Sequence, residues 1–268
     1  MARSRTIVVV CSLVAVVLAL ALAHLTNLGP WTVDVGTAPP DRIRYPIPNR
    51  VGTKFDPVGN ALPFNGNTII SRLSNSSDLS QSLFNLQAKL KNSPSSHLIA
   101  HLPQSSWHMS VFEGAVAIKR KPWHWPSDLP LDATVEECTA LFRAKLSSFA
   151  LQLALPLRLS VVGFASSGVG IHLQPHPDDA RQLRHLRDRL ADLLKMRNPR
   201  AHEYEFHISI GYLLRYLTDD QRVALDGILM GHFSELPKEV EMKSLEFCAF
   251  ENMLGYDCVL ELKNEIVE

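Results

Sequence analysis

Short runs in which apolar and polar residues alternate are interleaved, from about residue 66 onward, with segments whose apolar residues recur at helical spacing. Alternation places every second side chain on one face of a strand, whereas a period of 3.6 residues is typical of an amphipathic helix. The first pattern predicts strands at 67–73, 97–101, 106–113, 157–165, 169–174, 205–213, 243–250 and 256–262. The second predicts helices at 78–90, 134–153, 177–194 and 218–230.

The order of these elements favours an α+β fold over a doubly wound parallel sheet, because strands and helices do not alternate one by one. They divide into two groups on either side of Pro156, each with several strands and two helices. We therefore expect two halves, each a small sheet with helices on one face.

The first 62 residues have a different texture. Arg3 and Arg5 precede a charge-free apolar run that ends in Ala21-Leu22-Ala23, and residues 24–62 are rich in Pro, Gly and Asn without any period. The sequence thus predicts a signal peptide or signal anchor at 1–23, a linker or arm at 24–62 and a folded domain at 63–268.

Two outcomes remain open for the N-terminal segment. Cleavage near Ala23 would release a secreted protein, and retention would leave a single-pass membrane protein whose domain is luminal or extracellular, because the positive charges precede the apolar run. Both place the chain in the secretory pathway, with the N-terminal segment in contact with a membrane.

Composition adds limits on partners. The 268 residues include 27 basic and 27 acidic side chains, so the formal net charge is zero. Without a global positive field, general binding to duplex DNA is not expected, and any contact with a polyanion must be local. We expect a monomer.

Cysteine usage leaves one question open. Cys11 lies in the apolar segment, and the odd number that remains, Cys138, Cys248 and Cys258, requires at least one free thiol. Cys248 and Cys258 stand at equal distances from Met253 in a predicted C-terminal hairpin. They are either bridged across the strands or two independent buried thiols.

One short pattern occurs twice, as HMSV at 108–111 and as HISI at 207–210, each inside a predicted strand. In a strand, residues i and i+2 point to the same face about 7 Å apart, so an imidazole and a hydroxyl can both contact one phosphate group. We predict that His108 and His207 are catalytic residues and that Ser110 and Ser209 bind the phosphate group.

The two motif histidines also have a simpler explanation when each is taken alone. A single histidine on a strand is commonly a surface or hydrogen-bonded structural residue.

Two further features have alternative explanations. Phe112 shares the expected face of His108 and is a candidate to stack on a base, or else it is covered by the neighbouring half. His172 and His176 are four residues apart, but prolines interrupt the helical spacing that a metal site on one helix face would need. We expect no metal and no cofactor.

The two tetrapeptides, with their strand context and spacing of about one hundred residues, resemble the signature of the two-histidine (2H) phosphoesterase superfamily. The resemblance extends from about Pro63 to Leu262 and is nearest to a little-characterised fungal and bacterial branch. It implies a bilobal fold with two pseudo-symmetric antiparallel sheets, helices outside and a central groove that both motif strands face.

The resemblance also implies a metal-independent phosphodiesterase that acts on a 2′,3′-cyclic phosphate nucleotide or an RNA end. One imidazole would accept a proton from water while the other donates one to the leaving ribose oxygen. Two alternatives stay open: a non-catalytic nucleotide- or phosphate-binding module of the same fold, and a phosphodiesterase for another phosphoester such as a lipid headgroup.

Overall fold

The computed structural model describes residues 48, 50–165 and 169–264. The predicted signal segment at 1–23 and most of the predicted arm at 24–62 lie outside the described residues. Within the described part of the chain, no helix combines the length and apolarity needed to cross a membrane.

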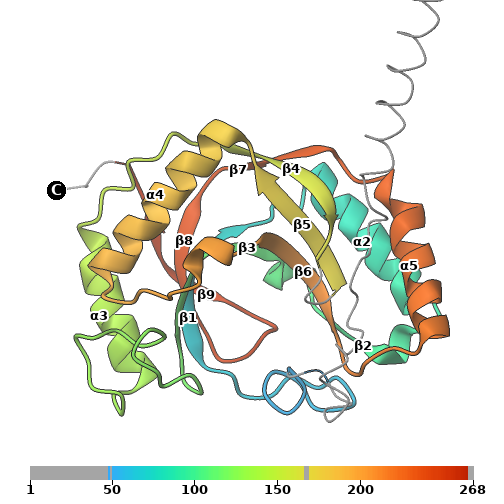
Figure 1. Ribbon diagram of the computed structural model, residues 1–268, viewed down its shortest axis with the longest axis horizontal. Coiled ribbons are helices and arrows are strands. Elements are labelled where there is room, and N and C mark those ends of the chain that lie inside the picture. Colours follow the sequence, from blue (N-terminus) through green and yellow to red (C-terminus); the bar gives the residue numbers. More distant parts are fainter. Residues whose placement is uncertain (1–47, 49, 166–168, 265–268) are drawn as a thin grey trace, which may run out of the picture. The chain divides into compact units, whose positions relative to one another are not determined.

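The strands of the described residues form one curled antiparallel sheet of nine strands (Figure 1). They are β1 (Gly66–Arg72), β2 (Ile99–His101), β3 (His108–Val116), β4 (Leu157–Phe164), β5 (Val169–Pro175), β6 (Phe206–Leu213), β7 (Glu239–Met242), β8 (Leu245–Phe250) and β9 (Asp257–Leu262). Their order across the sheet is β7-β4-β5-β6-β3-β1-β8-β9, with β2 also paired to β6. The predicted α+β class is confirmed.

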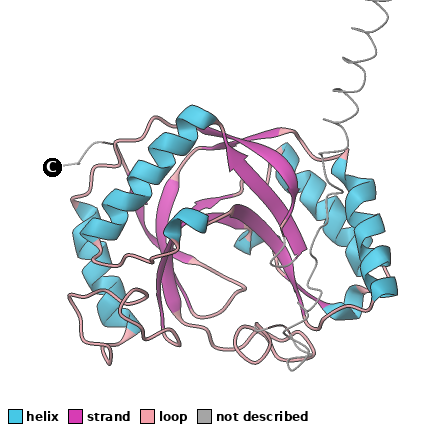
Figure 2. Cartoon of the chain, in the orientation of Figure 1, coloured by secondary structure: helices cyan, strands magenta, loops and turns pink. Residues whose placement is uncertain are grey.

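Four helices flank the strands in the described residues (Figure 2). They are α2 (Asp78–Lys91), α3 (Val135–Ser147), α4 (Pro177–Leu193) and α5 (Asp219–Phe233). In Figure 1, α3 and α4 cover one side of the sheet and α2 and α5 the other. Thr134 and Thr218 start α3 and α5 with reciprocal capping boxes, which satisfy backbone N–H groups that the first helical turn leaves free.

The two expected sheets are two halves of this single sheet, and the halves exchange elements. Strand β2, from the N-terminal part of the chain, pairs with β6, while the C-terminal hairpin β8–β9 pairs with β1. Pro156 is therefore not a boundary between independent lobes. The exchange has a physical reason, because the hairpin covers an edge of β1 that would otherwise present unpaired N–H and C=O groups.

The structure also differs from the sequence-based prediction in the region after α3. The helix was expected to continue to residue 153 but ends at Ser147, and the chain then continues without regular secondary structure to the start of β4. Leu151 and Leu153 are both buried, which is a period of two and not of 3.6, and both backbone N–H groups bond to the C-terminal segment. Strand β7 was not predicted because its four residues, EVEM, are mostly exposed, as an edge strand permits.

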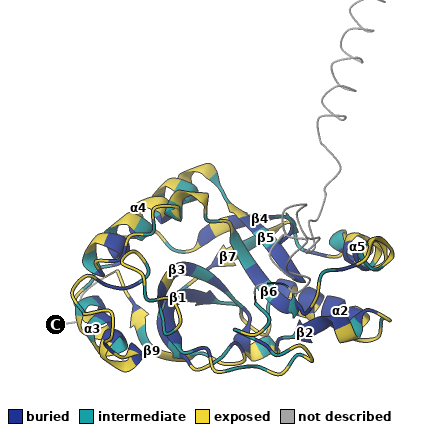
Figure 3. Cartoon of the chain, turned by 60° about the horizontal axis from the view of Figure 1, so that its bottom comes forward, coloured by how far each residue is buried: buried dark blue, intermediate teal, exposed yellow. Residues whose placement is uncertain are grey.

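The core lies between the sheet and its helices, where Figure 3 shows buried residues along β1, β3 and β6 and exposed residues on the outer faces of the helices. Its largest fully buried side chains include Trp107, Trp125, Phe142 and Phe247, and also Phe55. Phe55 belongs to the predicted arm and is 1% exposed. The described end of the arm is thus part of the packed domain.

The structure joins Cys248 and Cys258 in a disulfide between paired positions of β8 and β9, and leaves Cys138 as a buried free thiol. We expect thiol titration of the denatured, unreduced full-length chain to find two free thiols, Cys11 and Cys138, of the four cysteines. Four free thiols under conditions that exclude reductant would contradict the bridge. The Cys138→Ser variant should lower the count by one and serves as the control.

Candidate active site

The two His-x-Ser motifs lie on neighbouring antiparallel strands at the centre of the sheet. Strands β3 and β6 pair through Met109 and Ile208, the residue that follows each motif histidine. Both of these side chains are buried, with 3% and 4% exposed. A pseudo-twofold relation between the motifs follows from this pairing, because each strand contributes the same motif position.

The same register brings the four predicted site residues together on the opposite face. On either side of the Met109–Ile208 pair, His108 lies across from Ser209, and Ser110 lies across from His207. Each serine is thus a neighbour of the histidine from the other motif. All four side chains line one cleft with a volume of about 180 Å³.

Each motif strand has a β-bulge at the fourth residue of its motif. Val111 has no partner in β1, although its two neighbours pair with consecutive residues of that strand. Ile210 stands in the same relation to β5. An extra residue at a bulge reverses which side chains face which side of the sheet beyond it.

The bulges have matching support from the helices outside the sheet. The Nη1 group of Arg187 on α4 donates a hydrogen bond of 2.5 Å to the Val111 carbonyl. The Nε2 group of Gln87 on α2 donates one of 2.9 Å to the Ile210 carbonyl. The Ile210 carbonyl also accepts from the backbone N–H of Leu102 at 3.0 Å, so the buried Gln87 adds a second hydrogen bond at this bulge.

The bulges change which of the following residues face the cleft, compared with strict alternation. The fifth residue after each histidine, Glu113 and Tyr212, enters the cleft. Phe112 faces away from it, is 7% exposed and lines a separate pocket beneath α4. The base-stacking role predicted for Phe112 is therefore wrong, because the bulge at Val111 turns that ring to the other face of β3.

The rest of the cleft is formed by aromatic rings and by cations from segments distant in sequence. The rings are those of Phe64, Tyr204, Tyr212, Phe250 and Tyr256. The cations are Arg50, Lys54 and Lys119. Arg50 and Lys54 lie 5.3 Å and 5.2 Å from the centre of the Tyr212 ring. Both belong to the predicted arm, and the absence of periodicity there gave no signal of their role.

Both motif histidines are held in the same way. His108 Nδ1 is 2.7 Å from the carbonyl oxygen of Ser106, and His207 Nδ1 is 2.8 Å from that of Glu205. A carbonyl only accepts, so each Nδ1 carries the proton and donates it. In the neutral ring each Nε2 then has a free lone pair, and no described residue bonds to either Nε2.

Burial and charge keep the imidazole of His108 neutral. Burial lowers the pKa of His108 to about 4, while its hydrogen bond to the Ser106 carbonyl acts in the opposite direction. The nearby charges of His207, Arg72 and Lys54 lower this pKa further. The deprotonated ring is thus the stable form in the empty cleft.

His207 has a different set of neighbours. Burial lowers its pKa below 6.5, and Arg50 and His172 act in the same direction. Its hydrogen bond to the Glu205 carbonyl and the carboxylate of Glu113 raise it. Glu113 is the acidic group that the bulge in β3 brings into the cleft, so the fold gives His207 a counter-charge.

A tyrosine packs beside each histidine. The ring of Tyr256 meets that of His108 edge to face at 4.3 Å, and the ring of Tyr204 lies 6.0 Å from that of His207. Burial raises the pKa of both phenols, so both remain neutral. Tyr204 is in turn covered by the guanidinium of Arg187, whose Cζ is 4.5 Å from the ring centre.

The described residues contain one group with the spacing of a metal site, and it lies outside the cleft. Glu246, Cys248 and Cys258 offer ligand atoms within 4.8 Å of one another. The two sulfurs are joined in the disulfide, so they do not supply thiolates. The histidine cleft itself offers imidazoles, hydroxyls and cations, which suit an anion.

A curled α+β sheet thus holds two imidazoles and two hydroxyls in one cleft, whose cations suit an anion such as a phosphate group. Residues 54–170, which include the first motif, match a family model described as "2H-phosphodiest: Domain of unknown function (DUF1868)". This match spans 117 of the 268 residues and agrees with the resemblance of the two motifs to the two-histidine phosphoesterase superfamily.

One solved structure with the same fold covers most of the chain. A conserved protein of unknown function, ATU0111 from Agrobacterium tumefaciens, is 26% identical with a TM-score of 0.73, covering 81% of this chain and 94% of that one. More distant similarity is found to LigT from E. coli complexed with NADP+, at 13% identity and a TM-score of 0.42, covering 75% of this chain and 99% of that one. No curated protein matches the chain.

The lowered pKa of His108 can be measured directly. We expect an NMR titration of the full-length protein to give His108 a pKa of about 4, because burial and adjacent cations disfavour the imidazolium. The His108→Gln variant identifies the resonance. The exposed His97 provides the internal reference in the same spectra. A value for His108 at or above 6.5 would contradict the described environment.

Proposed function

We propose that the protein hydrolyses a 2′,3′-cyclic phosphate on a nucleotide or an RNA end by acid–base catalysis from His108 and His207. The observation that carries this proposal is the matched orientation of the two rings. Each Nδ1–H is anchored to a backbone carbonyl two residues earlier, so each Nε2 is the atom free to exchange a proton in the shared cleft. Hydrolysis of a cyclic phosphodiester needs two such groups, one on each side of phosphorus.

The surroundings of the rings favour distinct roles. His108 is deprotonated and lies near cations, which suits a general base that takes a proton from water. His207 has the Glu113 carboxylate nearby, which stabilises the imidazolium needed to protonate the leaving ribose oxygen. The water oxygen bonds to phosphorus as the bond from phosphorus to the ribose oxygen breaks, and the product is a phosphomonoester.

The remaining cleft residues suit the charge and shape of such a substrate. Ser110 and Ser209 donate hydrogen bonds to the non-bridging oxygens, where negative charge increases in the transition state. Arg50, Lys54 and Lys119 balance the negative charge of the phosphate. The cleft aromatics, Tyr212 among them, offer surfaces for a nucleobase in place of Phe112. Side chains supply acid, base and donors, so the scheme requires no metal ion.

Binding without turnover would need only the hydroxyls and the cations. Binding alone does not require two imidazoles in one cleft that both donate from Nδ1 to a carbonyl and both leave Nε2 free. Hydrolysis is therefore the better supported function. A phosphoester of a lipid headgroup would present the same diester, and the substrate panel of the experiment below separates it from a cyclic nucleotide.

Replacing either histidine should abolish most turnover. We expect His108→Ala and His207→Ala each to remove nearly all hydrolysis of 2′,3′-cyclic nucleotides, and the double variant to be little worse than the worse single variant, because both residues act in one transition state. Ser110→Ala and Ser209→Ala should lower kcat by about 10- to 1000-fold each, as single donors to a developing charge. Steady-state assays with a panel of cyclic nucleotides and phospholipid headgroup diesters make the measurement.

The matched control is His97→Ala, which removes an exposed histidine whose Nδ1 is also bonded to a carbonyl, that of Pro94, but which does not line the cleft. It should retain the wild-type rate. A folded His207→Ala protein with an unimpaired rate would refute the assignment of the active site.

The pH dependence should show the lowered pKa values. The base must be neutral, so kcat/KM falls as pH falls through the His108 pKa of about 4. The acid must be protonated, so kcat/KM falls as pH rises through the His207 pKa, which lies below 6.5. We expect a bell-shaped profile of kcat/KM with its maximum on the acid side of pH 6.5. A single-sided profile, or a maximum above pH 7, would contradict the paired-imidazole mechanism.

A further inference from the structure

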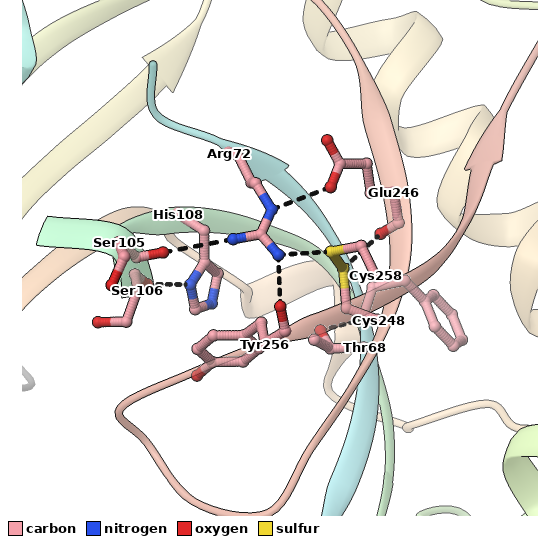
Figure 4. The surroundings of a disulfide bond; sticks show 10 residues. Thr68, Arg72, Ser105, Ser106, His108, Glu246, Cys248, Tyr256 and Cys258 are labelled. Atoms are coloured by element: carbon pink, nitrogen blue, oxygen red, sulfur yellow. Dashed lines mark hydrogen bonds and ion pairs between the residues drawn. A yellow bond between two sulfur atoms is a disulfide. The ribbon is translucent and has the colours of Figure 1, made fainter. Parts of the chain in front are cut away.

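Arg72 is the last residue of β1 and pairs with His108 in the register of β1 and β3. Figure 4 shows its guanidinium at the centre of a group of acceptors from three separate segments. It lies outside the set of residues that line the cleft. Any effect on the reaction must therefore pass through another residue.

One arm of this guanidinium holds the turn before the first motif. Its Nη1 group donates to the carbonyl of Ser105 at 3.3 Å. The next carbonyl along the chain, that of Ser106, accepts the Nδ1–H of His108 at 2.7 Å. Arg72 thus fixes the peptide segment that sets the tautomer and the orientation of the His108 ring (Figure 4).

A second arm holds the loop between β8 and β9. Its Nη2 group lies 2.5 Å from the carbonyl of Tyr256 and 2.8 Å from Sγ of Cys258. The ring of Tyr256 packs edge to face on His108 at 4.3 Å. The Cys248–Cys258 disulfide closes the base of this loop, and Arg72 ties the same base to β1.

The guanidinium of Arg72 also forms an ion pair on its third side. Nε of Arg72 lies 3.0 Å from Oε2 of Glu246 on β8, and the two side chains are 34% and 24% exposed. The planar guanidinium can reach acceptors in three directions at once, whereas a lysine ammonium on a flexible stem cannot hold the same set in one plane. The arrangement therefore requires arginine specifically.

We propose that Arg72 is a positioning residue for His108, holding the imidazole and the Tyr256 ring in fixed relative orientation by binding the backbone next to each. This role rests on the proposed function, in which His108 is the base. Loss of the guanidinium removes neither the His108 ring nor the Tyr256 ring. It removes the hydrogen bonds that hold the backbone next to each ring. A misplacement of about 1 Å at a reacting group lowers a rate by about 100-fold.

Charge is a separate contribution that the experiment must isolate. The groups that face His108 are Arg72 on β1, Lys54 from the N-terminal segment, His207 on β6 and the neutral Tyr256 from the β8–β9 loop. A cation near His108 disfavours its imidazolium, so removing the Arg72 charge raises the His108 pKa. Lysine at position 72 retains the charge and loses the shape, while glutamine loses both.

The test compares Arg72→Lys and Arg72→Gln with the wild type in kcat, KM, pH profile and NMR. Arg222→Lys and Arg222→Gln are matched controls, since Arg222 on α5 is 35% exposed, forms an ion pair with Asp219 and lies outside the cleft. We expect both Arg72 variants to lose about 100-fold in kcat with a smaller change in KM. Only Arg72→Gln should move the acidic limb of the profile to higher pH.

An activity-independent readout accompanies the kinetics. The edge-to-face contact with Tyr256 gives the His108 ring protons a ring-current shift in the wild type, assigned with His108→Gln. Both Arg72 variants should lose this shift, and both Arg222 variants should keep it. Melting temperatures show which variants are folded, and Arg72→Lys, which retains the charge, is sufficient for the test if Arg72→Gln does not fold.

The outcomes separate this inference from the proposed function. A folded Arg72→Lys protein with the wild-type kcat and the wild-type ring-current shift would overturn the positioning role. Loss of the shift in Arg72→Lys, with a wild-type enzyme inactive on every cyclic phosphate, would support the positioning role and overturn the proposed function. A fall in kcat in the Arg72 variants without any change in the ring-current shift of His108 would also overturn the positioning role, because Arg72 would then act on the reaction by a route other than His108.

Discussion

Val111 and Ile210 interrupt the pairing register of two neighbouring strands at equivalent points, and the composition of the cleft depends on these two bulges. A helix side chain supports each bulge: Arg187 donates to the Val111 carbonyl, and Gln87 donates to the Ile210 carbonyl, which also accepts from the Leu102 backbone N–H. The helices therefore do more than cover the apolar face. The bulges that they support bring Glu113 and Tyr212, rather than their neighbours, into the cleft.

The pseudo-twofold relation between the motifs extends from the backbone to the anchoring of the rings, but it stops at the charges. Both histidines donate from Nδ1 to a carbonyl two residues earlier, and both have a tyrosine beside them. The fifth residue after the histidine breaks the symmetry, because it is a carboxylate in one motif and a phenol in the other. Identical tetrapeptide patterns can thus hold one base and one acid, as acid–base catalysis requires.

Segments from both ends of the described chain complete the site. Arg50 and Lys54 arrive with a segment anchored by the buried Phe55, and Tyr256 arrives with a hairpin loop that the disulfide closes and Arg72 attaches to β1. The central strands carry the two histidines and the two serines, and these peripheral segments set the charge around them and the orientation of their neighbours. Rigid strands are suited to the first task because their register fixes distances, and loops are suited to the second because they tolerate insertion and exchange.

The sequence by itself determined the α+β class, most of the strands and helices, and the four polar residues of the repeated motif, because periodicity and the i, i+2 relation in a strand are local properties of the chain. It did not determine the bulges, so it placed Phe112 on the face of His108. It also gave no signal for Arg50, Lys54 or Arg72 and left the bridge between Cys248 and Cys258 undecided. These features depend on contacts between residues far apart in the chain, such as Gln87 with Ile210 or Arg72 with Tyr256, which only the tertiary structure brings together.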